Sequence, residues 1–306
     1  MALVRVHPYG LTPVGPPNRL AASTLRRGLL LRWEEDGVAG HADLFPWPEL
    51  GDPDLDSLRS DLRTGKTSQL TDAALAWAQR EAAAHRAGLC WFPAPDVRSH
   101  VSLAAGDRTQ APLAKAKLAG DDPEEAVAIL NRSPATRFRF DLNGLFSDSD
   151  RATRWWSALS RWRDRIDFLE DPTDLAHVPQ ARAWFPGARI ALDRFAAEEL
   201  WRHADILVLK PSTSAPAPAP SFGGPLVVTS VMGHPVGQLQ ALHAAQTWRD
   251  SGAELLECGL ATHHLYEAHP HREWVVNTDS CLRPSLAKGT GLGLSERLDA
   301  LAWEAP

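Results

Sequence analysis

The feature of this sequence that most constrains its fold is a rhythm that starts near residue 98. From there on, short apolar runs alternate with helical stretches. Eight runs can be counted: HVSLAA, APLAKAKLA, FRFDLNG, IDFLEDP, RIALDRF, DILVLKP, PLVVTSV and ELLECGL. Strands that alternate with helices eight times are typical of a parallel barrel with helices on its outside. We therefore predict an α/β fold with a (β/α)₈-type TIM barrel over residues 98–285.

The sixth unit departs from this rhythm. The run that ends at Lys210 is followed by PSTSAPAPAPSFGGP, whose repeated prolines forbid a regular helix. We predict that helix 6 is replaced by this Pro-rich segment in an extended, polyproline-like crossing. A disordered linker between two domains is the alternative, and it is disfavoured because the strand-like PLVVTSV resumes at once.

Residues 1–97 have a different pattern, which predicts a smaller α+β domain. ALVRVHPYG is typical of a strand, and RRGLLLRWEEDGVAGHADLFP is typical of a hairpin with EEDG as its turn. TDAALAWAQREAAAHRAG indicates a helix. We expect Thr71 or Asp72 to cap its start and Gly88 to end it.

Charge and composition exclude several classes of protein. A net charge of −6, without any block of Lys and Arg, argues against nucleic acid as a partner. No apolar run approaches the ~18 residues that a membrane helix needs, so we expect no membrane contact. The three cysteines form no CxxC pair, which indicates reduced thiols in a cytoplasmic protein. The oligomeric state stays open.

Lysine is rare in this chain, and its positions are informative. The sequence has 27 arginines but only five lysines. Lys115 and Lys117 lie two residues apart inside an apolar run, and Lys210 closes another run. Unlike a guanidinium group, the ammonium group of lysine can lose its proton near neutral pH and act as a base. Alternation along a strand puts Lys115 and Lys117 on one face, where their repulsion lowers the pKa of at least one of them.

Three acids stand near the ends of successive apolar runs: Asp141, Glu170 and Asp193. Counted from Lys117 they follow at intervals of 24, 29 and 23 residues, and Lys210 comes 17 residues later. Because the carboxyl ends of barrel strands meet at one mouth, these side chains are expected to face one another. Three carboxylates without His or Cys favour Mg²⁺, with Mn²⁺ as the alternative. A divalent ion flanked by lysines suits the removal of a proton next to a carboxylate, so we expect a small-molecule carboxylate substrate.

Other interpretations stay open. A non-catalytic ligand-binding barrel would carry the lysines on its outside. Zinc could be held by His263, His264, His269 and His271, but no carboxylate or cysteine stands at ligand spacing near them. Phosphate binding is disfavoured because SVMGHPVG lacks a glycine-rich anion cradle. Asp171, beside the second acid, is expected to cap a helix or form a turn.

Together these residues resemble the enolase superfamily and, within it, the o-succinylbenzoate synthases of menaquinone biosynthesis. The matching segments are KAK at 115–117, RFDLNG at 139–144, DFLEDP at 167–172, ALD at 191–193, LKPS at 209–212 and GHPVGQLQALHAA at 233–245. GHADLFPWPELGD is similar to a hairpin segment of that superfamily's capping domain, and GTGLG at 289–293 is similar to its final segment. The resemblance covers nearly the whole chain.

The resemblance implies a chemical role for each matched residue. Lys117 would be the general base, Lys115 would tune it, and Lys210 on the opposite face would stabilise an enediolate. The metal ligands for Mg²⁺ would be Asp141, Glu170 and Asp193. The enzyme would be a carbon–oxygen lyase that performs a syn dehydration of 2-succinyl-6-hydroxy-2,4-cyclohexadiene-1-carboxylate to 2-succinylbenzoate. In this reaction the base returns its proton to the departing hydroxyl.

The resemblance also implies substrate contacts and domain limits. Arg139 would help to orient the base, Asn143 would lie beside the metal or the substrate, and Ser230 would line the pocket near the succinyl group. Residues 1–97 would form the α+β capping domain, whose loop 9–20 closes over the substrate. Residues 286–306 would pack back on that domain.

Two departures from the family pattern leave the substrate open. Arg194 replaces an acid that many relatives carry, and Gly233 replaces an acid before HP. The alternative within the superfamily is an N-acylamino acid racemase or a dipeptide epimerase that uses Lys117 and Lys210 as opposed bases. Dipeptide epimerases usually carry two acids in a DxD pattern on the last strand, and ECGLATH has none.

Overall fold

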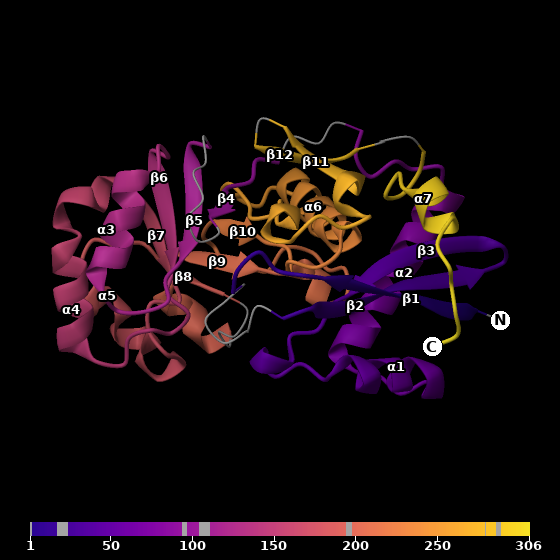
Figure 1. Cartoon of the computed structure of the whole chain (residues 1–306), viewed down its shortest axis with the longest axis horizontal. Coiled ribbons are helices and arrows are strands. Elements are labelled where there is room, and N and C mark those ends of the chain that lie inside the picture. The colour runs from indigo at the N-terminus through magenta and orange to yellow at the C-terminus, as the bar shows by residue number, and fades with distance from the viewer. Residues whose placement is uncertain are drawn as a thin grey trace.

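Seven of the eight apolar runs form one parallel sheet in the computed structural model of the chain, which describes residues 2–16, 24–93, 97–103, 111–193, 198–278, 280–285 and 289–306 (Figure 1). The strands are β4 (Val101–Leu103), β5 (Leu113–Lys117), β6 (Arg137–Asp141), β7 (Ile166–Glu170), β8 (Ile190–Leu192), β9 (Ile206–Leu209) and β10 (Leu226–Val228). Each strand pairs with its neighbours in the sequence, from β10 at one end of the sheet to β4 at the other. This is the strand order of a barrel.

The eighth run closes the sheet through isolated bridges. On one side, the Gly259 N–H donates to the Val228 carbonyl at 2.8 Å. On the other side, the His100 N–H, just before β4, donates to the Cys258 carbonyl at 2.7 Å. The eighth run therefore lies between β10 and the segment that leads into β4, and the predicted (β/α)₈-type barrel is confirmed.

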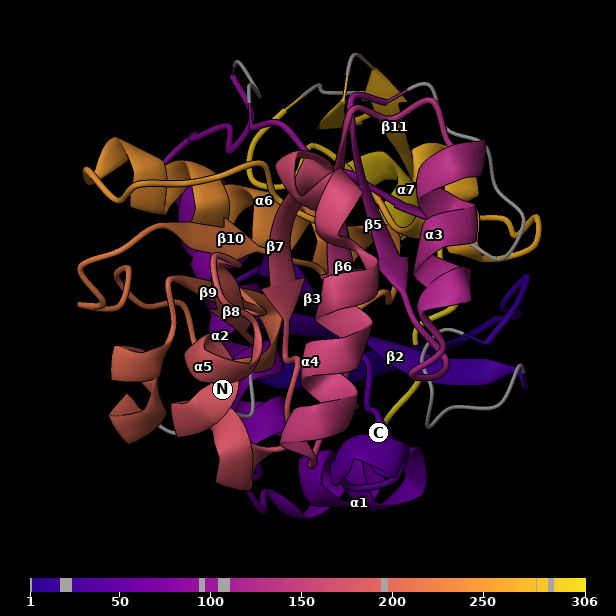
Figure 2. The ribbon, with the colours of Figure 1, turned by 90° about the vertical axis from the view of Figure 1, so that its left-hand side faces the viewer.

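Helices cover the outer face of the strands (Figure 2). The α-helices of the barrel are α3 (Pro123–Arg132), α4 (Ser149–Ala158), α5 (Ala181–Trp184) and α6 (Pro235–Asp250). Its 3₁₀ segments are η2 (Ser160–Arg165), η3 (Leu175–Gln180), η4 (Glu198–His203), η5 (Pro211–Thr213), η6 (His263–Leu265) and η7 (Arg272–Trp274). Two short strands, β11 (Val275–Thr278) and β12 (Cys281–Pro284), pair with each other.

The N-terminal domain contains an antiparallel sheet of β1 (Leu3–Leu11), β2 (Arg26–Glu35) and β3 (Val38–Leu44), followed by η1 (Pro48–Leu50), α1 (Leu55–Thr64) and α2 (Gln69–Arg86). The predicted hairpin is present, since Asp36 and Gly37, with φ of 53° and 75°, form a two-residue turn between β2 and β3. Gly88, with φ of 65°, follows the end of α2 as predicted, but the predicted N-terminal cap of this helix is wrong. The N-cap is Ser68, whose side chain accepts a hydrogen bond from the Thr71 N–H. The Thr71 side chain accepts in return from the Ser68 N–H, which completes a capping box.

The predicted loop 9–20 begins later than expected. Residues 9–11 belong to β1, because they continue its pairing with β2 as far as Leu11 and Arg26. The Val14 N–H then donates to the Leu265 carbonyl at 2.9 Å, so this part of the segment lies against the last loop of the barrel. Residues 17–20 of the loop lie outside the described residues.

The sixth unit has no α-helix, as predicted. After η5, residues 214–225 form neither helix nor strand. The indole N–H of Trp77, on α2, donates to the carbonyls of Pro211 at 3.1 Å and Ser214 at 3.0 Å. The indole N–H of Trp248, on α6, donates to the Ala217 carbonyl at 2.8 Å. The segment is thus tied to both domains, and the disordered-linker alternative is wrong.

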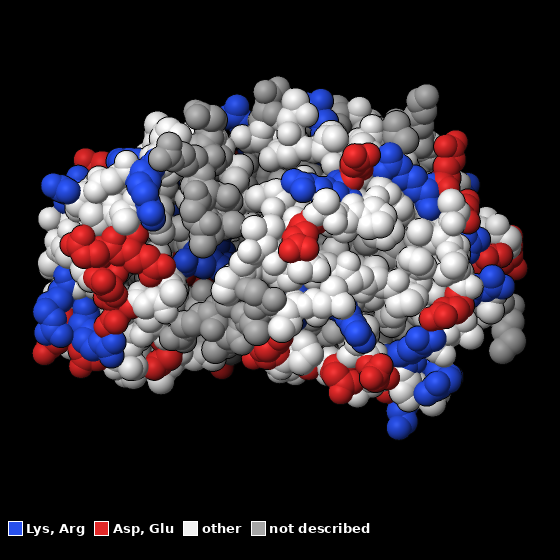
Figure 3. All heavy atoms as spheres, in the orientation of Figure 1, with Lys and Arg blue, Asp and Glu red and all other residues white. Residues whose placement is uncertain are grey.

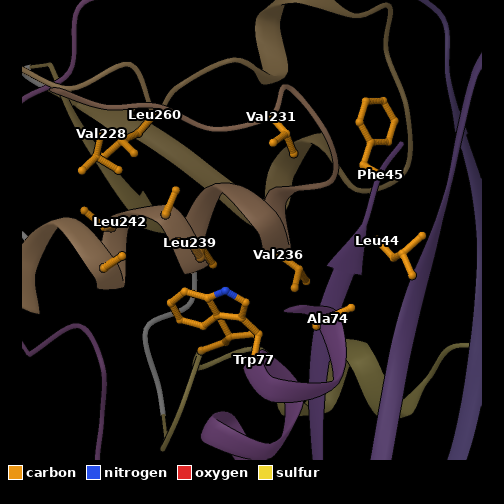
Figure 4. Close-up of a cluster of buried hydrophobic side chains, with 14 of the residues drawn as sticks. Leu44, Phe45, Ala74, Trp77, Val228, Val231, Val236, Leu239, Leu242 and Leu260 are labelled. Atoms are coloured by element: carbon orange, nitrogen blue, oxygen red, sulfur yellow. The ribbon is translucent and has the colours of Figure 1, made fainter. Parts of the chain in front are cut away.

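Apolar side chains from both domains share one core (Figure 4). Trp77 of α2 lies beside Val236 and Leu239 of α6, with Leu44 and Phe45 nearby. The end of the chain also lies along the N-terminal domain, beyond α7 (Ser295–Asp299). There Val6 and Glu304 exchange two backbone hydrogen bonds of 2.9 and 3.0 Å, which explains why the two termini lie close together in Figure 1.

The face of the molecule drawn in Figure 3 carries charges of both signs. On the face drawn in Figure 3, groups of Lys and Arg stand beside groups of Asp and Glu at both ends of the molecule, and no continuous positive stripe crosses the described atoms. Within the described part of the chain, no helix has the length and apolarity needed to cross a membrane.

Gly40 allows α2 to lie directly on β3. A Cβ at this position would stand 1.9 Å from the Ala78 carbonyl oxygen and 2.5 Å from the Ala82 nitrogen, both in α2. We expect Gly40→Ala to lower the free energy of unfolding by about 1–3 kcal/mol, since the helix must move outward. Urea denaturation measures this loss. Gly120→Ala is the control, because nothing lies within 4 Å of the added Cβ; an equal loss in both variants would contradict the close packing.

Candidate active site

The parallel register of three strands aligns three of the predicted site residues. Lys117 on β5 pairs with Asp141 on β6, and Asp141 pairs with Glu170 on β7. Asp193 directly follows β8, and Lys210 directly follows β9. All five stand at the carboxyl ends of their strands and therefore at the same mouth of the barrel.

A cavity of about 370 Å³ lies at this mouth. Both domains contribute to its walls: Trp47 and Leu50 come from the N-terminal domain, and Leu175 and Met232 add apolar surface from the barrel. The charged residues of its lining are Lys115, Lys117, Asp141, Asp171, Asp174, Asp193 and Lys210. A cavity of this size, largely apolar with a few converging charges, is typical of a site for a small organic molecule.

Lys115 is buried between two carboxylates. Its Nζ lies 2.9 Å from Asp141 Oδ2 and 2.6 Å from Glu170 Oε1. Burial alone would lower the pKa of Lys115, but the charges of Asp141, Glu170 and Asp193 outweigh it and raise the pKa above its ordinary value. Lys115 is therefore a fixed positive charge.

Lys117 has the opposite electrostatic environment. Its Nζ lies 3.9 Å from Asp141 Oδ2. About 30% of its side chain is exposed, and this side chain lines the cavity. Burial lowers its pKa, Asp141 opposes this, and the positive charges of Lys115 and Lys210 lower it further. Of the two neighbouring lysines, Lys117 is thus the one whose neutral amine is favoured.

The opposite side of the mouth carries a second set of charges. Lys210 bonds to the Asp193 carboxylate. Asp171, which we expected to cap a helix or form a turn, lies in a bend with a left-handed φ of 43° and also lines the cavity, whereas the next 3₁₀ segment is capped by Asp174. Its Oδ1 accepts a hydrogen bond from the Asp193 N–H at 3.0 Å, and burial together with the charges of Asp193 and Glu170 raises its pKa.

The donor chemistry of Asp141, Glu170 and Asp193 fits a hard cation such as Mg²⁺. Burial raises the pKa of Glu170 to about 7; Lys115 opposes this rise, while Asp141 and Asp193 add to it. This crowding of negative charge is what a divalent cation would relieve. As they stand, the described residues hold no group of three Asp, Glu, His or Cys side chains in metal-binding geometry. Metal binding would require the carboxylates to exchange ammonium contacts for metal contacts.

Arg139 does not line the cavity. It pairs with Lys115 in the register of β5 and β6, and its side chain is fully buried inside the barrel. Its Nε donates to Asp167 at 2.7 Å, and its NH1 group contacts His100 Nδ1 at 2.9 Å and the Glu257 carbonyl. We therefore assign it no direct substrate contact.

Asn143 and Ser230 both line the cavity, on opposite walls. The Asn143 N–H donates to Asp141 Oδ1 at 3.3 Å, and Ser230 Oγ lies 2.9 Å from Thr262 Oγ1. Sequence reasoning missed Trp47, Leu175 and Thr262, because single polar or apolar residues in loops carry no periodic signal. Arg194, one of the departures noted above, lies outside the described residues.

Comparison with known proteins gives a consistent answer. Residues 4–84 match the family described as O-succinylbenzoate synthase, N-terminal domain. Over 99% of its length the chain is 30% identical to o-succinylbenzoate synthase of Bdellovibrio bacteriovorus, of which 98% is covered.

Solved structures share the fold at lower identity. The L-Ala-D/L-Glu epimerase from Bacillus subtilis superposes with a TM-score of 0.75 at 15% identity, covering 95% of this chain and 97% of that one. A member of the enolase superfamily from Roseovarius nubinhibens, complexed with magnesium, superposes with a TM-score of 0.70 at 19% identity, covering 99% and 98%.

The lowered pKa of Lys117 has a direct chemical consequence. In the metal-free protein we expect an amine-directed acylating reagent to modify Lys117 at a lower pH than the exposed Lys66, and to modify Lys115 last. Modification followed from pH 7 to 11 by peptide mass spectrometry measures the order. Lys117 reacting only above the pH at which Lys66 reacts would contradict the electrostatics of the site.

Proposed function

Because the chain belongs to the o-succinylbenzoate synthase family of the enolase superfamily, and is therefore a lyase, we propose that it catalyses the Mg²⁺-dependent syn dehydration of 2-succinyl-6-hydroxy-2,4-cyclohexadiene-1-carboxylate to 2-succinylbenzoate. The observation that carries this proposal is Lys117, an amine of lowered pKa that opens into a cavity beside buried carboxylates. Because members of this family are enzymes, the alternative of a non-catalytic ligand-binding barrel is wrong. We propose a cytoplasmic role in menaquinone biosynthesis on the same basis.

Lys117 would act first as a base and then as an acid. Its neutral amine takes the proton from the ring carbon that bears the carboxylate, and the electron pair of the C–H bond moves into that carboxylate to give an enediolate. The Lys117 ammonium then gives this proton to the hydroxyl on the adjacent carbon. The C–O bond breaks, water leaves, and the electron pair completes the aromatic ring. Because one side chain serves both steps, hydrogen and hydroxyl leave from the same face.

Lys115 and Lys210 would act through their charge. Lys115 stays protonated between its two carboxylates and helps to keep the neighbouring Lys117 amine neutral. Lys210 approaches the cavity from β9 and would stabilise the negative charge of the enediolate. Asp141, Glu170 and Asp193 would hold Mg²⁺, which when bound supplies positive charge next to the substrate carboxylate.

The walls of the cavity suit the rest of the substrate. Trp47, Leu175 and Met232 offer apolar surface to the cyclohexadiene ring. Ser230 and Thr262 present a pair of hydroxyls on the wall near β10, and we propose that they bind the succinyl carboxylate. Asn143 would contact the metal or the substrate from the other wall.

Turnover of the cyclohexadiene precursor tests the proposal directly. With Mg²⁺ we expect its absorbance to fall as 2-succinylbenzoate forms, EDTA to stop the reaction, and excess Mg²⁺ or Mn²⁺ to restore it. Lys117→Ala should lower kcat by roughly 10²–10⁴-fold, the usual contribution of a general base. Lys66→Ala, on the exposed surface, is the control and should keep wild-type turnover. Absence of turnover in folded, Mg²⁺-loaded protein would contradict the synthase proposal.

A second candidate function rests on the presence of both Lys117 and Lys210 in the cavity lining. Two lysines on opposite sides of an α-proton could racemise N-acylamino acids or epimerise dipeptides. Lys210→Arg separates the two cases, because arginine keeps the positive charge but cannot serve as a base. We expect this variant to retain a measurable part of its dehydration rate.

Proton exchange gives the complementary measurement. Wild-type protein in D₂O with N-acylamino acids should exchange the α-proton far more slowly than it dehydrates the cyclohexadiene, as followed by proton NMR. Fast exchange of both enantiomers, with loss of exchange for only one of them in Lys210→Arg, would favour the racemase instead.

A further inference from the structure

A strained turn forms the cavity wall next to β10. Val231 and Met232 line the cavity, and the chain then runs through Gly233 and His234 into α6. Met232 has a φ of 58°, a left-handed conformation that is unfavourable for any residue with a Cβ. A turn of this kind keeps its shape only where neighbouring groups hold it.

Two side chains of the N-terminal domain hold the far end of this turn. Asp43 Oδ2 accepts a hydrogen bond from the His234 N–H at 3.0 Å. Asp43 Oδ1 accepts a second bond from the Tyr9 hydroxyl at 2.6 Å, and the Tyr9 oxygen lies 3.2 Å from the same His234 N–H. Tyr9, Asp43 and His234 are all buried.

The backbone of the barrel leaves a space for the Asp43 carboxylate. A Cβ on Gly233 or on Gly237 would come within 2.4 Å of Asp43 Oδ2, so any larger residue at either position would displace it. The carboxylate also faces the start of α6, where the helix dipole favours a negative charge. Gly233 stands where many relatives carry an acid, and in this chain the space beside it is filled by the carboxylate of Asp43 from the N-terminal domain.

Burying this acid is unfavourable by itself. Among the described residues, no salt bridge joins Asp43 to a lysine or an arginine, and its partners are the Tyr9 hydroxyl and the His234 N–H. Burial raises the pKa of Asp43 to about 7, and these two hydrogen bonds oppose the rise. Adhesion between the domains does not need a buried acid, since the apolar core of Figure 4 already joins them.

We infer that Asp43, with Tyr9, is a positioning residue that fixes the Val231–Met232 wall and thereby sets the affinity for the substrate. Neither side chain lines the cavity, so both act through the turn. Asp43 and Tyr9 hold the turn at His234, and two other residues bind Val231 and Met232 themselves: the Trp47 indole N–H donates to the Val231 carbonyl at 3.0 Å, and the Tyr266 hydroxyl donates to the Met232 carbonyl. The inference rests on the proposed function for the identity of the substrate.

Gln240 provides a matched control. Its side chain also joins the N-terminal domain to α6, because its Oε1 accepts from the Asp43 N–H and its Nε2 donates to the His41 carbonyl, both at 3.3 Å. Neither contact involves residues 231–234. If the interdomain contacts had only a structural role, Gln240→Met would change KM and backbone hydrogen exchange as much as the Asp43 and Tyr9 variants do.

The experiment compares Asp43→Asn, Tyr9→Phe and Gln240→Met with the wild type, all as full-length, Mg²⁺-loaded protein. We expect KM for the cyclohexadiene precursor to rise about tenfold in Asp43→Asn and Tyr9→Phe, with kcat changed less than about threefold, as the loss of one buried hydrogen bond predicts. In Gln240→Met we expect a lower melting temperature but a KM within about twofold of wild type. Tyr9→Phe removes a single hydroxyl, so it serves if Asp43→Asn does not fold.

Backbone hydrogen exchange supplies a readout that does not depend on turnover. Without substrate, exchange of the amides of residues 231–234 and 236 should accelerate at least about tenfold in Asp43→Asn and Tyr9→Phe and stay unchanged in Gln240→Met. Equal KM and equal exchange in all three variants would overturn the positioning role, and so would faster exchange with an unchanged KM. A wild type without turnover would count against the proposed function, while unchanged exchange in the Asp43 and Tyr9 variants would still overturn the positioning role on its own.

Discussion

The site depends above all on the register of β5, β6 and β7. Pairing of Lys117 with Asp141, and of Asp141 with Glu170, sets one lysine and two carboxylates in a row across three strands. A slip of one residue would turn a charged side chain outward, among the buried Phe140 and Leu169 that face the helices. An unpaired buried charge costs several kcal/mol, which is comparable to the whole free energy of unfolding of a domain. The apolar pattern of the strands and the charges of the site therefore favour the same register.

Charge balance inside the barrel continues one layer below the site. Arg139 lies next to Lys115 in the sheet and is neutralised by Asp167, with Glu257 and His100 close to it. Lys115 is neutralised in turn by the two carboxylates above it. Lys117 is paired more weakly than Lys115, with its nearest carboxylate oxygen at 3.9 Å. This difference between two lysines on one strand makes one of them a fixed charge and the other a candidate base.

Much of this arrangement could be predicted from the sequence, because it depends on periodic signals. Eight apolar runs at the spacing of βα units predicted the barrel, and the position of a charge at the end of a run predicted which side chains share its mouth. The prolines after Lys210 predicted the missing helix for a different reason: proline restricts its own backbone and lacks an N–H, so its effect is local.

The errors concern contacts that no local pattern encodes. The cap of α2 fell on Ser68 because its side chain and that of Thr71 satisfy each other, although Thr71 and Asp72 are equally good caps by residue type. The orienting role expected of Arg139 stays a prediction: its side chain is buried away from the cavity, where Asp167 of the neighbouring strand β7 and Glu257, 118 positions further along, bind it. The close approach of the Asp43 carboxylate to Gly233 joins residues that are 190 positions apart. It depends on the absence of a Cβ at Gly233, so no local sequence pattern predicts it.

We propose that Asp141, Glu170 and Asp193 gather around one divalent cation. Anomalous diffraction from crystals soaked in Mn²⁺ measures this directly, since the manganese peak can be assigned without reference to its ligands. We expect a single strong peak within roughly 2.0–2.4 Å of an oxygen from each of the three carboxylates, with Lys115 and Lys210 displaced from them. A peak elsewhere in the barrel, or no peak while both lysines keep their bonds to the carboxylates, would contradict it.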